Sequence, residues 1–409
     1  MPERTRYSLD EIVENGLCMG CGICRSVLGA AKVTTTLEAD GLERPRALKP
    51  FDDDDIERLN AICPGVHVSF PDVADGIDRD PMWGPIARIS RGYASDPAIR
   101  YRAASGGALT GLGIHLIETR KVDYIMHLKA DPDRPLLSKA HRSYTRDDVI
   151  SASGSRYTAS APLASITEGL DEGRPFAFIG KPCDVTALAN LARQDTRVGQ
   201  LCRYTLTIVC GGFSELSKFR DLLAAWDMDE RDVTRFSFRG NGCPGPTAAT
   251  TKDGRHRETA YWELWAAEET WRNFYRCKIC PDAIGLSADL AALDVWDGCN
   301  PTREDAGWNA FLCRTGKGRA LLEDAVRTGH VTLDAEWTTA DLDRAQPHQT
   351  RKRRAVRARY EAMRLAGAPY PVTEDPGLDL VSLAQGSEDY GSELAGTAER
   401  LRRDAHRRG

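Results

Sequence analysis

The stretch FAFIGKPCDVTALANLARQ, residues 176–194, decides the fold class. Its first five residues form an unbroken apolar run, which is typical of a short buried β-strand, and VTALANLARQ has the pattern of a helix. Cys183 lies at the junction between the two. A strand that leads directly into a helix is the repeating unit of an α/β fold, so the same arrangement should recur along the chain.

The strand and helix pattern does recur on both sides of this stretch. SGGALTGLGIHLIETRK (105–121) predicts a helix after a Ser-Gly-Gly start, and VDYIMHL (122–128) predicts a strand. YTLTIVCGGF (204–213) repeats the order of apolar strand, cysteine and glycine break. Strands that alternate with helices predict a mostly parallel sheet covered on both faces.

The length of 409 residues predicts two or three domains. The basic run TRKRRAVRAR (350–359) continues into YEAMRLAG, which predicts a helix with a solvated basic face. The C-terminal segment is polar and should be a frayed helix or a disordered tail. The expected boundaries are 1–75 for a small cysteine-bearing module, 76–90 for a linker, 91–345 for a mixed α/β core, 346–381 for a helical extension and 382–409 for the tail.

The composition is that of a soluble globular protein, with 41% hydrophobic and 28% charged residues. The sequence contains no run of 18 apolar residues, so we expect no membrane span. The charged N-terminus lacks the apolar core of a signal peptide, so we expect a cytoplasmic protein. The net charge of -5 argues against a nucleic-acid partner. Twelve clustered cysteines in a reducing compartment favour metal ligation over disulfides.

The first cysteine cluster, CMGCGIC, places Cys18, Cys21 and Cys24 at the C-x2-C-x2-C spacing that wraps a 4Fe–4S cube. The intervening glycines let the backbone turn tightly and direct amides at the sulfides. Cys63 in AICPG precedes a proline, the usual setting of a remote fourth ligand. We therefore predict a ferredoxin-like N-terminal module with one cluster, and a structural zinc site on the same cysteines is the alternative.

Five further cysteines lie in contexts that suit ligation. Cys183 and Cys210 each follow a predicted strand, and ligands gather at the carboxyl ends of strands in open α/β sheets. Cys277 and Cys280 form a C-x-x-C pair in RCKICPD, and Cys243 lies in GNGCPG. Any four of the five could hold a second cube, and scattered buried thiols are the alternative. The cysteines without such a context are Cys202, Cys299 and Cys313.

The chain resembles the coenzyme F420 hydrogenase/dehydrogenase beta-subunit family, which includes ferredoxin-dependent 7-hydroxymethyl chlorophyll a reductase and one type of divinyl chlorophyllide 8-vinyl reductase. The resemblance runs from about residue 15 to residue 365. It is carried, in order, by CMGCGIC…CPG, ASGGALTGL, VDYIMHLKAD, SGSRYTAS, GKPCDVTAL, VCGGF, RGNGCPGP and RCKICPDAIGLSADLAALDVW.

The resemblance implies two 4Fe–4S clusters and FAD. It assigns Cys183, Cys210, Cys277 and Cys280 to an inner cluster, with Cys243 as a reserve ligand, and the first four cysteines to an outer cluster. For FAD it favours the ASGG segment, because amides at a helix start suit a pyrophosphate, whereas a plain N-cap at a serine is the alternative. The residues expected to contact FAD are Ser105, Gly106, Gly107, Ser155, Tyr157 and Lys181.

Three functions follow as expectations. The first is a self-sufficient reductase that passes electrons from ferredoxin through both clusters to FAD and then to an organic small molecule. The second is a subunit that exchanges hydride with coenzyme F420 and docks on a hydrogenase or dehydrogenase. The third is a non-catalytic zinc-bound scaffold. No proton donor can be named from the sequence, and a homo-oligomer is compatible with it.

Overall fold

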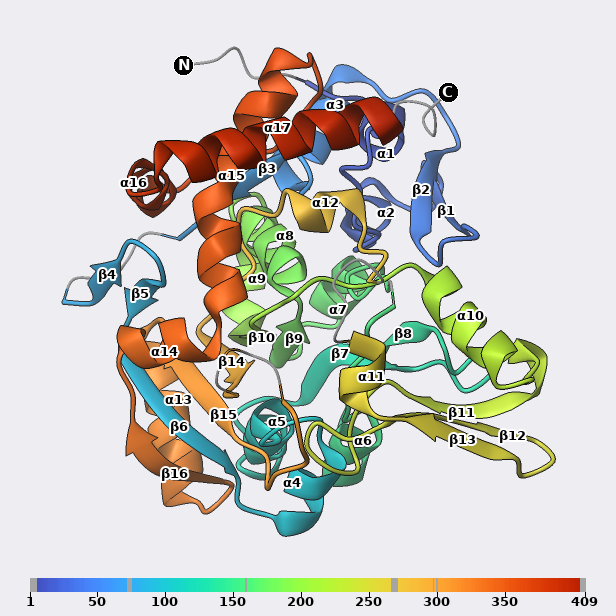
Figure 1. The fold of residues 1–409 in the computed structure, drawn as a ribbon, viewed down its shortest axis with the longest axis vertical. Helices are drawn as coiled ribbons and strands as arrows, with labels where there is room; N and C mark the ends of the chain where they lie inside the picture. Colours follow the sequence, from blue (N-terminus) through green and yellow to red (C-terminus); the bar gives the residue numbers. More distant parts are fainter. Residues whose placement is uncertain are drawn as a thin grey trace.

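An eight-stranded mixed sheet forms the centre of the molecule in this computed structural model, which describes residues 6–404 except 72–75, 159, 266–270, 297, 299 and 300 (Figure 1). The strand order is β16–β6–β15–β14–β10–β9–β7–β8. The strands are β6 (Arg88–Ala94), β7 (Tyr124–Ala130), β8 (Ser138–Ser143), β9 (Phe176–Gly180), β10 (Cys202–Ile208), β14 (Leu290–Asp294), β15 (Asn309–Cys313) and β16 (Val331–Glu336).

The expectation of a mostly parallel sheet is wrong. Only the central strands β14, β10, β9 and β7 run parallel, through three pairings. The other four pairings of this sheet are antiparallel. Antiparallel neighbours need no helical crossover, so strands such as β7 and β8 pair through a short connection. The α/β character is confirmed, and the sheet is mixed.

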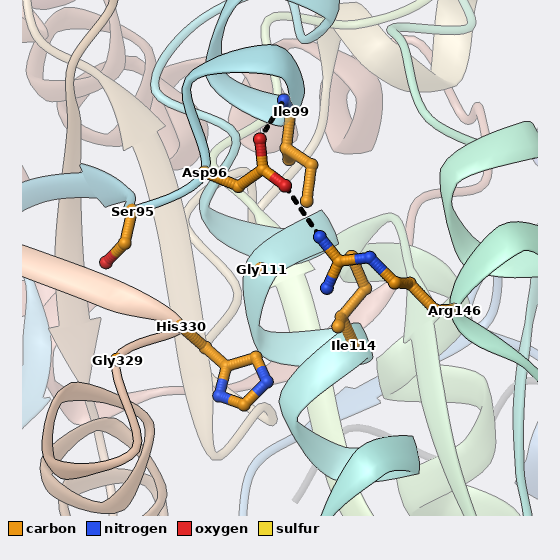
Figure 2. A pocket seen from close by; sticks show the side chains of 8 residues that line it. All are labelled: Ser95, Asp96, Ile99, Gly111, Ile114, Arg146, Gly329 and His330. Atoms are coloured by element: carbon orange, nitrogen blue, oxygen red, sulfur yellow. Dashed lines mark hydrogen bonds and ion pairs between the residues drawn. The ribbon is translucent and has the colours of Figure 1, made fainter.

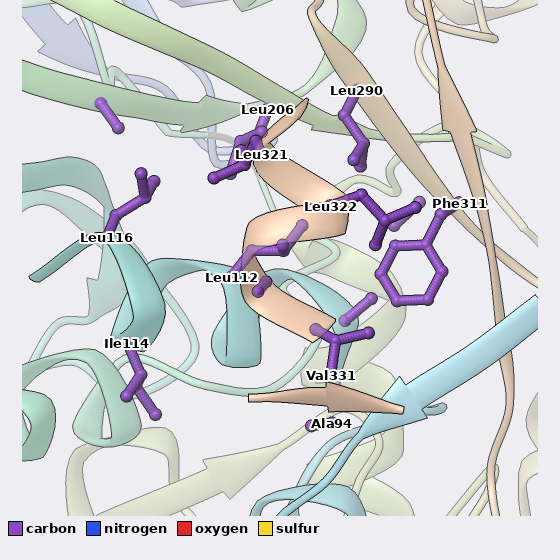
Figure 3. Close-up of a cluster of buried hydrophobic side chains, with 14 of the residues drawn as sticks. Ala94, Leu112, Ile114, Leu116, Leu206, Leu290, Phe311, Leu321, Leu322 and Val331 are labelled. Carbon is purple, nitrogen blue, oxygen red and sulfur yellow. The ribbon is translucent and has the colours of Figure 1, made fainter. Parts of the chain in front are cut away.

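Two apolar clusters cover the two faces of the sheet, as expected. Successive side chains of a strand point to opposite faces. Ala177 of β9 accordingly packs in the cluster beneath α5 (Ala108–Glu118) and α13 (Gly316–Arg327), whose centre includes Leu112 and Phe311 (Figure 3). Phe176 and Phe178 pack in the opposite cluster, beneath α8 (Pro182–Ala192). The FAFIG run is therefore apolar throughout because both of its faces are buried.

The N-terminal segment folds into short elements around the first cysteines. They are α1 (Leu9–Glu14), α2 (Ile23–Leu28), the hairpin β1 (Val33–Leu37) and β2 (Glu43–Ala47), α3 (Asp53–Ile62) and β3 (His67–Ser69). The acidic run of residues 52–55 opens α3, because the Asp52 carboxylate accepts a hydrogen bond from the Asp55 amide in a capping box.

The C-terminal segment folds back over the N-terminal elements (Figure 1). β17 (Val372–Glu374) pairs in parallel with β3, and Val356, Leu378 and Leu401 share one apolar cluster with Leu9 of α1. The segment that was expected to be frayed or disordered is helical from Ser387 to Asp404. Its elements are α14 (Thr339–Ala345), α15 (Pro347–Leu365), β17, α16 (Pro376–Leu383) and α17 (Ser387–Asp404).

The expectation of a solvated basic face on α15 is wrong for three of its arginines. Arg353 pairs with Asp375, Arg357 pairs with Asp379 and Arg359 pairs with Glu393. The carboxylates come from the segment that folds back, which neutralises this part of the helix. Three of the six basic residues of the run therefore attach the segment that folds back, whereas Arg351 and Arg354 are exposed.

The remaining elements connect or flank these layers. The expected linker contains a hairpin, β4 (Asp78–Asp80) and β5 (Gly84–Ile86), and a three-stranded sheet extends from the core. No described helix is long and apolar enough to cross a membrane. The other elements are α4 (Pro97–Arg102), α6 (Arg146–Ser151), α7 (Ile166–Asp171), α9 (Thr196–Leu201), α10 (Leu216–Ala225), a 3-10 turn (Glu230–Asp232), β11 (Val233–Ser237), β12 (Thr247–Thr251), β13 (His256–Thr259), α11 (Tyr261–Trp265) and α12 (Tyr275–Lys278).

Candidate functional site

The first four cysteines converge at the junction of α1, α2 and α3. Burial raises the pKa of Cys24 above its ordinary value, and the charges of Cys18 and Cys63 raise it further. Burial likewise raises the pKa of Cys63 to about 12, with Cys18 as the next contribution. Cys21 interacts in the same way with Cys63 and Cys24. Cys24 lies in an apolar cluster against which Cys18 and Cys63 also pack, whereas Cys21 belongs to the neighbouring cluster beneath α8, so the structure brings three of the four expected outer ligands to one cluster.

Two glycines shape this cysteine loop. Gly20 and Gly22 have φ values of +68° and +81°, which favour glycine over residues with a Cβ. The Gly20 amide donates to the Cys18 sulfur at 3.4 Å. A Cβ on Gly22 would lie 2.8 Å from the Cβ of Ala164, so the loop also packs closely against the core domain.

The cysteines expected for the inner cluster line one hollow. Cys183 lies in the first turn of α8 beyond β9, Cys210 follows β10, and Cys277 and Cys280 lie on and just after α12. All four line this hollow together with Met19, Lys181, Arg276 and Lys352. Cys183 and Cys210, which each follow a strand, thus lie next to the C-x-x-C pair, as their positions after strands predicted.

These thiols suit thiolate ligation better than nucleophilic chemistry. Burial raises the pKa of Cys210 to about 11, and it also raises the pKa of Cys183 and Cys277. A thiol with a raised pKa is a poor nucleophile at neutral pH, but a metal that coordinates it removes its proton. Among the described residues, no group of three or more His, Cys, Asp or Glu side chains is positioned to hold a metal ion. The four thiols that line the hollow nevertheless match the donor type and number that a 4Fe–4S cluster takes.

Cys243, the reserve ligand, lies elsewhere. Its sulfur contacts the Ala104 carbonyl at 3.7 Å, and its nearest charges are those of Asp305, Asp294 and Arg239. It is not among the residues that line the hollow. The cysteines without a ligand context have separate surroundings: Cys202 faces the Tyr204 carbonyl, Cys313 is buried in the sheet core, and Cys299 lies outside the described residues.

The two cysteine sets are neighbours, as the expected electron path through both clusters requires. Met19, between Cys18 and Cys21, reaches the inner hollow. The Arg276 guanidinium, which also lines that hollow, donates from Nη2 to the Pro64 carbonyl at 2.8 Å. Arg276 and Lys352 were missed as site residues, although the position of Arg276 directly before a C-x-x-C cysteine was a usable signal.

The ASGG segment packs against Trp308 and Asn309, at the start of β15. Ser105 donates to the Trp308 carbonyl, and the Ala108 amide donates to the Asn309 carboxamide oxygen at 3.1 Å. The N-cap of α5 is Gly107, with φ of +75°, so the alternative of an N-cap at Ser105 is not what the structure shows. A Cβ on Gly106 would lie 2.8 Å from the Asn309 amide, which accounts for the glycine by close packing.

Tyr157 belongs to a second group of polar and aromatic side chains next to ASGG. Its hydroxyl accepts a hydrogen bond from Arg239 Nη1 at 3.0 Å, and the same nitrogen pairs with Asp294 at 2.9 Å. The buried guanidinium lies 4.9 Å from the ring centroids of both Tyr261 and Trp296. Its Nη2 donates to Ala104, the first residue of ASGG. The structure therefore joins ASGG to Tyr157 through Arg239, which was not predicted as a site residue.

The other two expected FAD contacts, Ser155 and Lys181, have different surroundings from each other. Ser155 is half-buried in the loop before Tyr157. Lys181 forms an ion pair with Asp184 at 2.8 Å and lies 5.5 Å from the Phe213 ring. Because Lys181 lines the inner hollow, the structure groups it with the cysteines and not with ASGG.

A separate cavity of about 360 Å³ lies between α5, α6 and the start of β16 (Figure 2). Arg146 crosses it to pair with Asp96 at 2.6 Å and with Glu118 at 3.3 Å. His330 Nε2 donates to the Glu118 carboxylate at 2.7 Å. None of the site residues expected from the sequence lines this cavity. Its charges are paired internally, so it offers no unpaired group to a ligand.

His115, next to this cavity, should make folding stability depend on pH. Its side chain is fully buried, and burial lowers its pKa from 6.5 to about 4, against the opposing charge of Asp324. A histidine with a lowered pKa stabilises the fold above pH 6.5, and that stability is lost as the pH falls towards 4, because the unfolded chain binds the proton more readily. We expect a loss of about 2 kcal/mol in the free energy of unfolding from this group between pH 7 and pH 5.

Urea denaturation at the two pH values measures this effect. His115→Gln should reduce the difference in the free energy of unfolding between pH 7 and pH 5. The matched control is His256→Gln, because the His256 side chain is 54% exposed and should leave the difference unchanged. An unchanged pH dependence in His115→Gln would contradict the assignment.

Comparison with known proteins decides the family. The model of the N-terminal part of the coenzyme F420 hydrogenase/dehydrogenase beta subunit matches residues 89–168, and the model of its C-terminal part matches residues 173–337. The chain belongs to the coenzyme F420 hydrogenase/dehydrogenase beta-subunit family. The inner cysteines, ASGG and Arg239 all lie within the family region, whereas the four outer cysteines precede it.

Relatives in this family are subunits of F420-linked enzymes. The beta subunit of F420-dependent formate dehydrogenase 1 of Methanococcus maripaludis is 28% identical over 59% of this chain and 60% of its own length. The coenzyme F420 hydrogenase beta subunit of Methanosarcina barkeri is 22% identical over 61% of this chain and 82% of its own length. Thus the match spans only about 60% of the formate dehydrogenase subunit.

A solved structure has the same fold as this chain. A chain of the F420-reducing [NiFe] hydrogenase complex from Methanosarcina barkeri superimposes with a TM-score of 0.52 and 17% identity. The superposition covers 73% of this chain and 99% of the hydrogenase chain. Over a quarter of this chain therefore lies outside the shared fold.

Proposed function

We propose that this chain is an iron–sulfur flavoprotein subunit that exchanges electrons with a deazaflavin of the coenzyme F420 kind, within a hydrogenase or dehydrogenase complex. The observation that carries this proposal is the convergence of Cys183, Cys210, Cys277 and Cys280 on one hollow inside the family region. Family membership favours this second expectation over the first, a self-sufficient reductase.

The chain's own residues have distinct roles in this proposal. The four inner cysteines would hold one 4Fe–4S cluster, and Cys18, Cys21, Cys24 and Cys63 would hold another. FAD would lie near ASGG and Tyr157, and the bound cofactors would supply the conversion between single electrons and hydride.

Arg239 would act on the flavin region through a fixed charge. Asp294 and the Tyr157 hydroxyl hold its guanidinium in place, and the Tyr261 and Trp296 rings flank it and exclude water from it. A fixed cation in a dry environment favours an anionic ring nearby. Ser155 and Lys181 stay as expected FAD contacts in this proposal, and no residue is assigned as a proton donor.

The outer cysteines support a second candidate, a ferredoxin-dependent reductase of an organic small molecule. They lie in residues 18–63, before the family region, and contact the inner site through Met19 and Arg276. Such a module would accept single electrons from ferredoxin without a dedicated partner subunit. The two candidates share the cofactors and differ in the electron acceptor.

Cofactor counting and a paired assay test the proposal. The chain, purified without air, should be brown and contain iron, sulfide and FAD, and should reduce coenzyme F420 with a low-potential donor. Turnover with reduced ferredoxin and an organic acceptor, but none with F420, would establish the second candidate. A colourless protein that contains zinc would overturn both and establish the scaffold.

A further inference from the structure

Arg276 is a buried cation at the boundary between the two cysteine sets. Its residue is 3% exposed, and it directly precedes Cys277 in α12. Its side chain lines the inner hollow, and its Nη2 donates to the carbonyl of Pro64, the residue after Cys63, at 2.8 Å. One side chain therefore contacts the surroundings of both sets.

The charge of Arg276 has no carboxylate partner within the described part of the chain. The bond to Pro64 is its one hydrogen bond there, and its Nε has no partner. A buried cation without a counter-charge is unfavourable, so an anion is expected beside it. Arg276 directly precedes Cys277, and its guanidinium bonds to the carbonyl of the residue after Cys63, so its charge lies beside both cysteine sets.

Thiolate-bound clusters supply the missing anion. Four thiolates outweigh the positive charge of the iron–sulfur core, so each cluster is anionic and becomes more so on reduction. A neighbouring cation favours the reduced state, and the charge near a cluster is one of the main determinants of its potential. Arginine keeps this charge at every working pH, because its guanidinium is not deprotonated in proteins.

We propose that Arg276 is a positioning residue that links the two clusters: its bond to Pro64 holds the Cys63 loop against α12, and its charge favours reduction of both clusters. This inference rests on the proposed function, because it requires both clusters. One residue would then set the reduction potentials of two clusters that carry electrons on successive steps of the same path.

The test is a potentiometric titration of both clusters followed by electron paramagnetic resonance. Arg276→Gln removes the charge, and each cluster should become harder to reduce by a factor of about 10 in its equilibrium constant, which is about 59 mV for one electron. Arg276→Lys keeps the charge and should shift both potentials by less than half as much. If Arg276→Gln does not fold, Arg276→Met takes its place, because it buries no polar group.

Lys352 of α15 provides the matched control. It lines the same hollow and donates at 3.4 Å to the carbonyl of Gly211, the residue after Cys210. Lys352→Gln should therefore shift the potential of the inner cluster alone. We expect Arg276→Gln to shift the reduction potentials of both clusters and Lys352→Gln to shift only that of the inner cluster.

The outcomes separate this inference from the proposed function. Iron and sulfide counts on the unmodified chain come first, and the absence of two clusters would overturn the proposed function itself. With two clusters present, unchanged potentials in a fully loaded Arg276→Gln or Arg276→Met would overturn only the role of Arg276. A purely structural role would lower the melting temperature or the cluster content and leave both potentials in place.

Discussion

Cys63→Ser should remove the outer cluster and slow the reduction of the flavin by external one-electron donors by about 100-fold or more, while FAD stays bound. Loss of a residue that only supports a metal ligand lowers affinity by about 10- to 100-fold, so loss of a ligand itself should do at least as much. The proposed inner ligands lie on α8, on and just after α12 and beyond β10, and do not include this residue. Half of the iron should therefore remain.

Iron, sulfide and flavin counts and stopped-flow reduction of the flavin measure this result. Cys202→Ser is the matched control, because Cys202 is also a buried thiol, but its sulfur contacts the Tyr204 carbonyl and it is not among the residues that line the inner hollow. It should keep all of the iron and the parent rate. Fast flavin reduction in Cys63→Ser would show that electrons enter without the outer cluster.

Asp375→Ala should lower the free energy of unfolding by about 3–5 kcal/mol, because it leaves the buried charge of Arg353 unpaired. The Asp375 carboxylate lies 2.5 Å from the Arg353 guanidinium, and the side chains are 1% and 4% exposed. Its other oxygen accepts from the Gly377 amide at 3.0 Å and caps α16. The substitution therefore removes both a buried ion pair and a helix cap.

Urea denaturation provides the measurement, and a second pair on the same helix provides the control. Arg357 pairs with Asp379, whose side chain is 60% exposed, so Asp379→Ala should cost only about 0–1 kcal/mol. The double variant Arg353→Met with Asp375→Leu should recover much of the loss, because it leaves no unpaired charge. Equal effects of the two single alanine variants would contradict the role of burial.

The sequence predicted those features that depend on neighbouring residues. The apolar FAFIG run predicted a strand buried on both faces, and the position of Cys183 and Cys210 after strands predicted their convergence. The pairing of β15 with β14 and β6 depends on contacts between distant segments, so the mixed sheet was not predicted. The attachment of α15 to Asp375 and Glu393 was missed for the same reason, since an arginine-rich helix looks the same whether its partners are water or carboxylates.

Cys243 shows the limit of reasoning from local context. GNGCPG resembled the other cysteine segments in its glycine and proline content, yet the fold takes it to Ala104 and Arg239. Its proximity to ASGG and Tyr157 arises because residues 239–245 return to the start of α5 after β11. Such a return depends on the path of the whole chain and has no local signal.

The return of the C-terminal helices over the N-terminal elements bears on how the protein matures. Cys24 shares an apolar cluster with Val356, Tyr360 and Met363, and Cys18 and Cys63 pack against the same cluster. The side chains of α15 that share this cluster therefore follow the whole family region, residues 89–337, in the chain. It follows that α15 can cover the N-terminal thiols only after the family region has been synthesised.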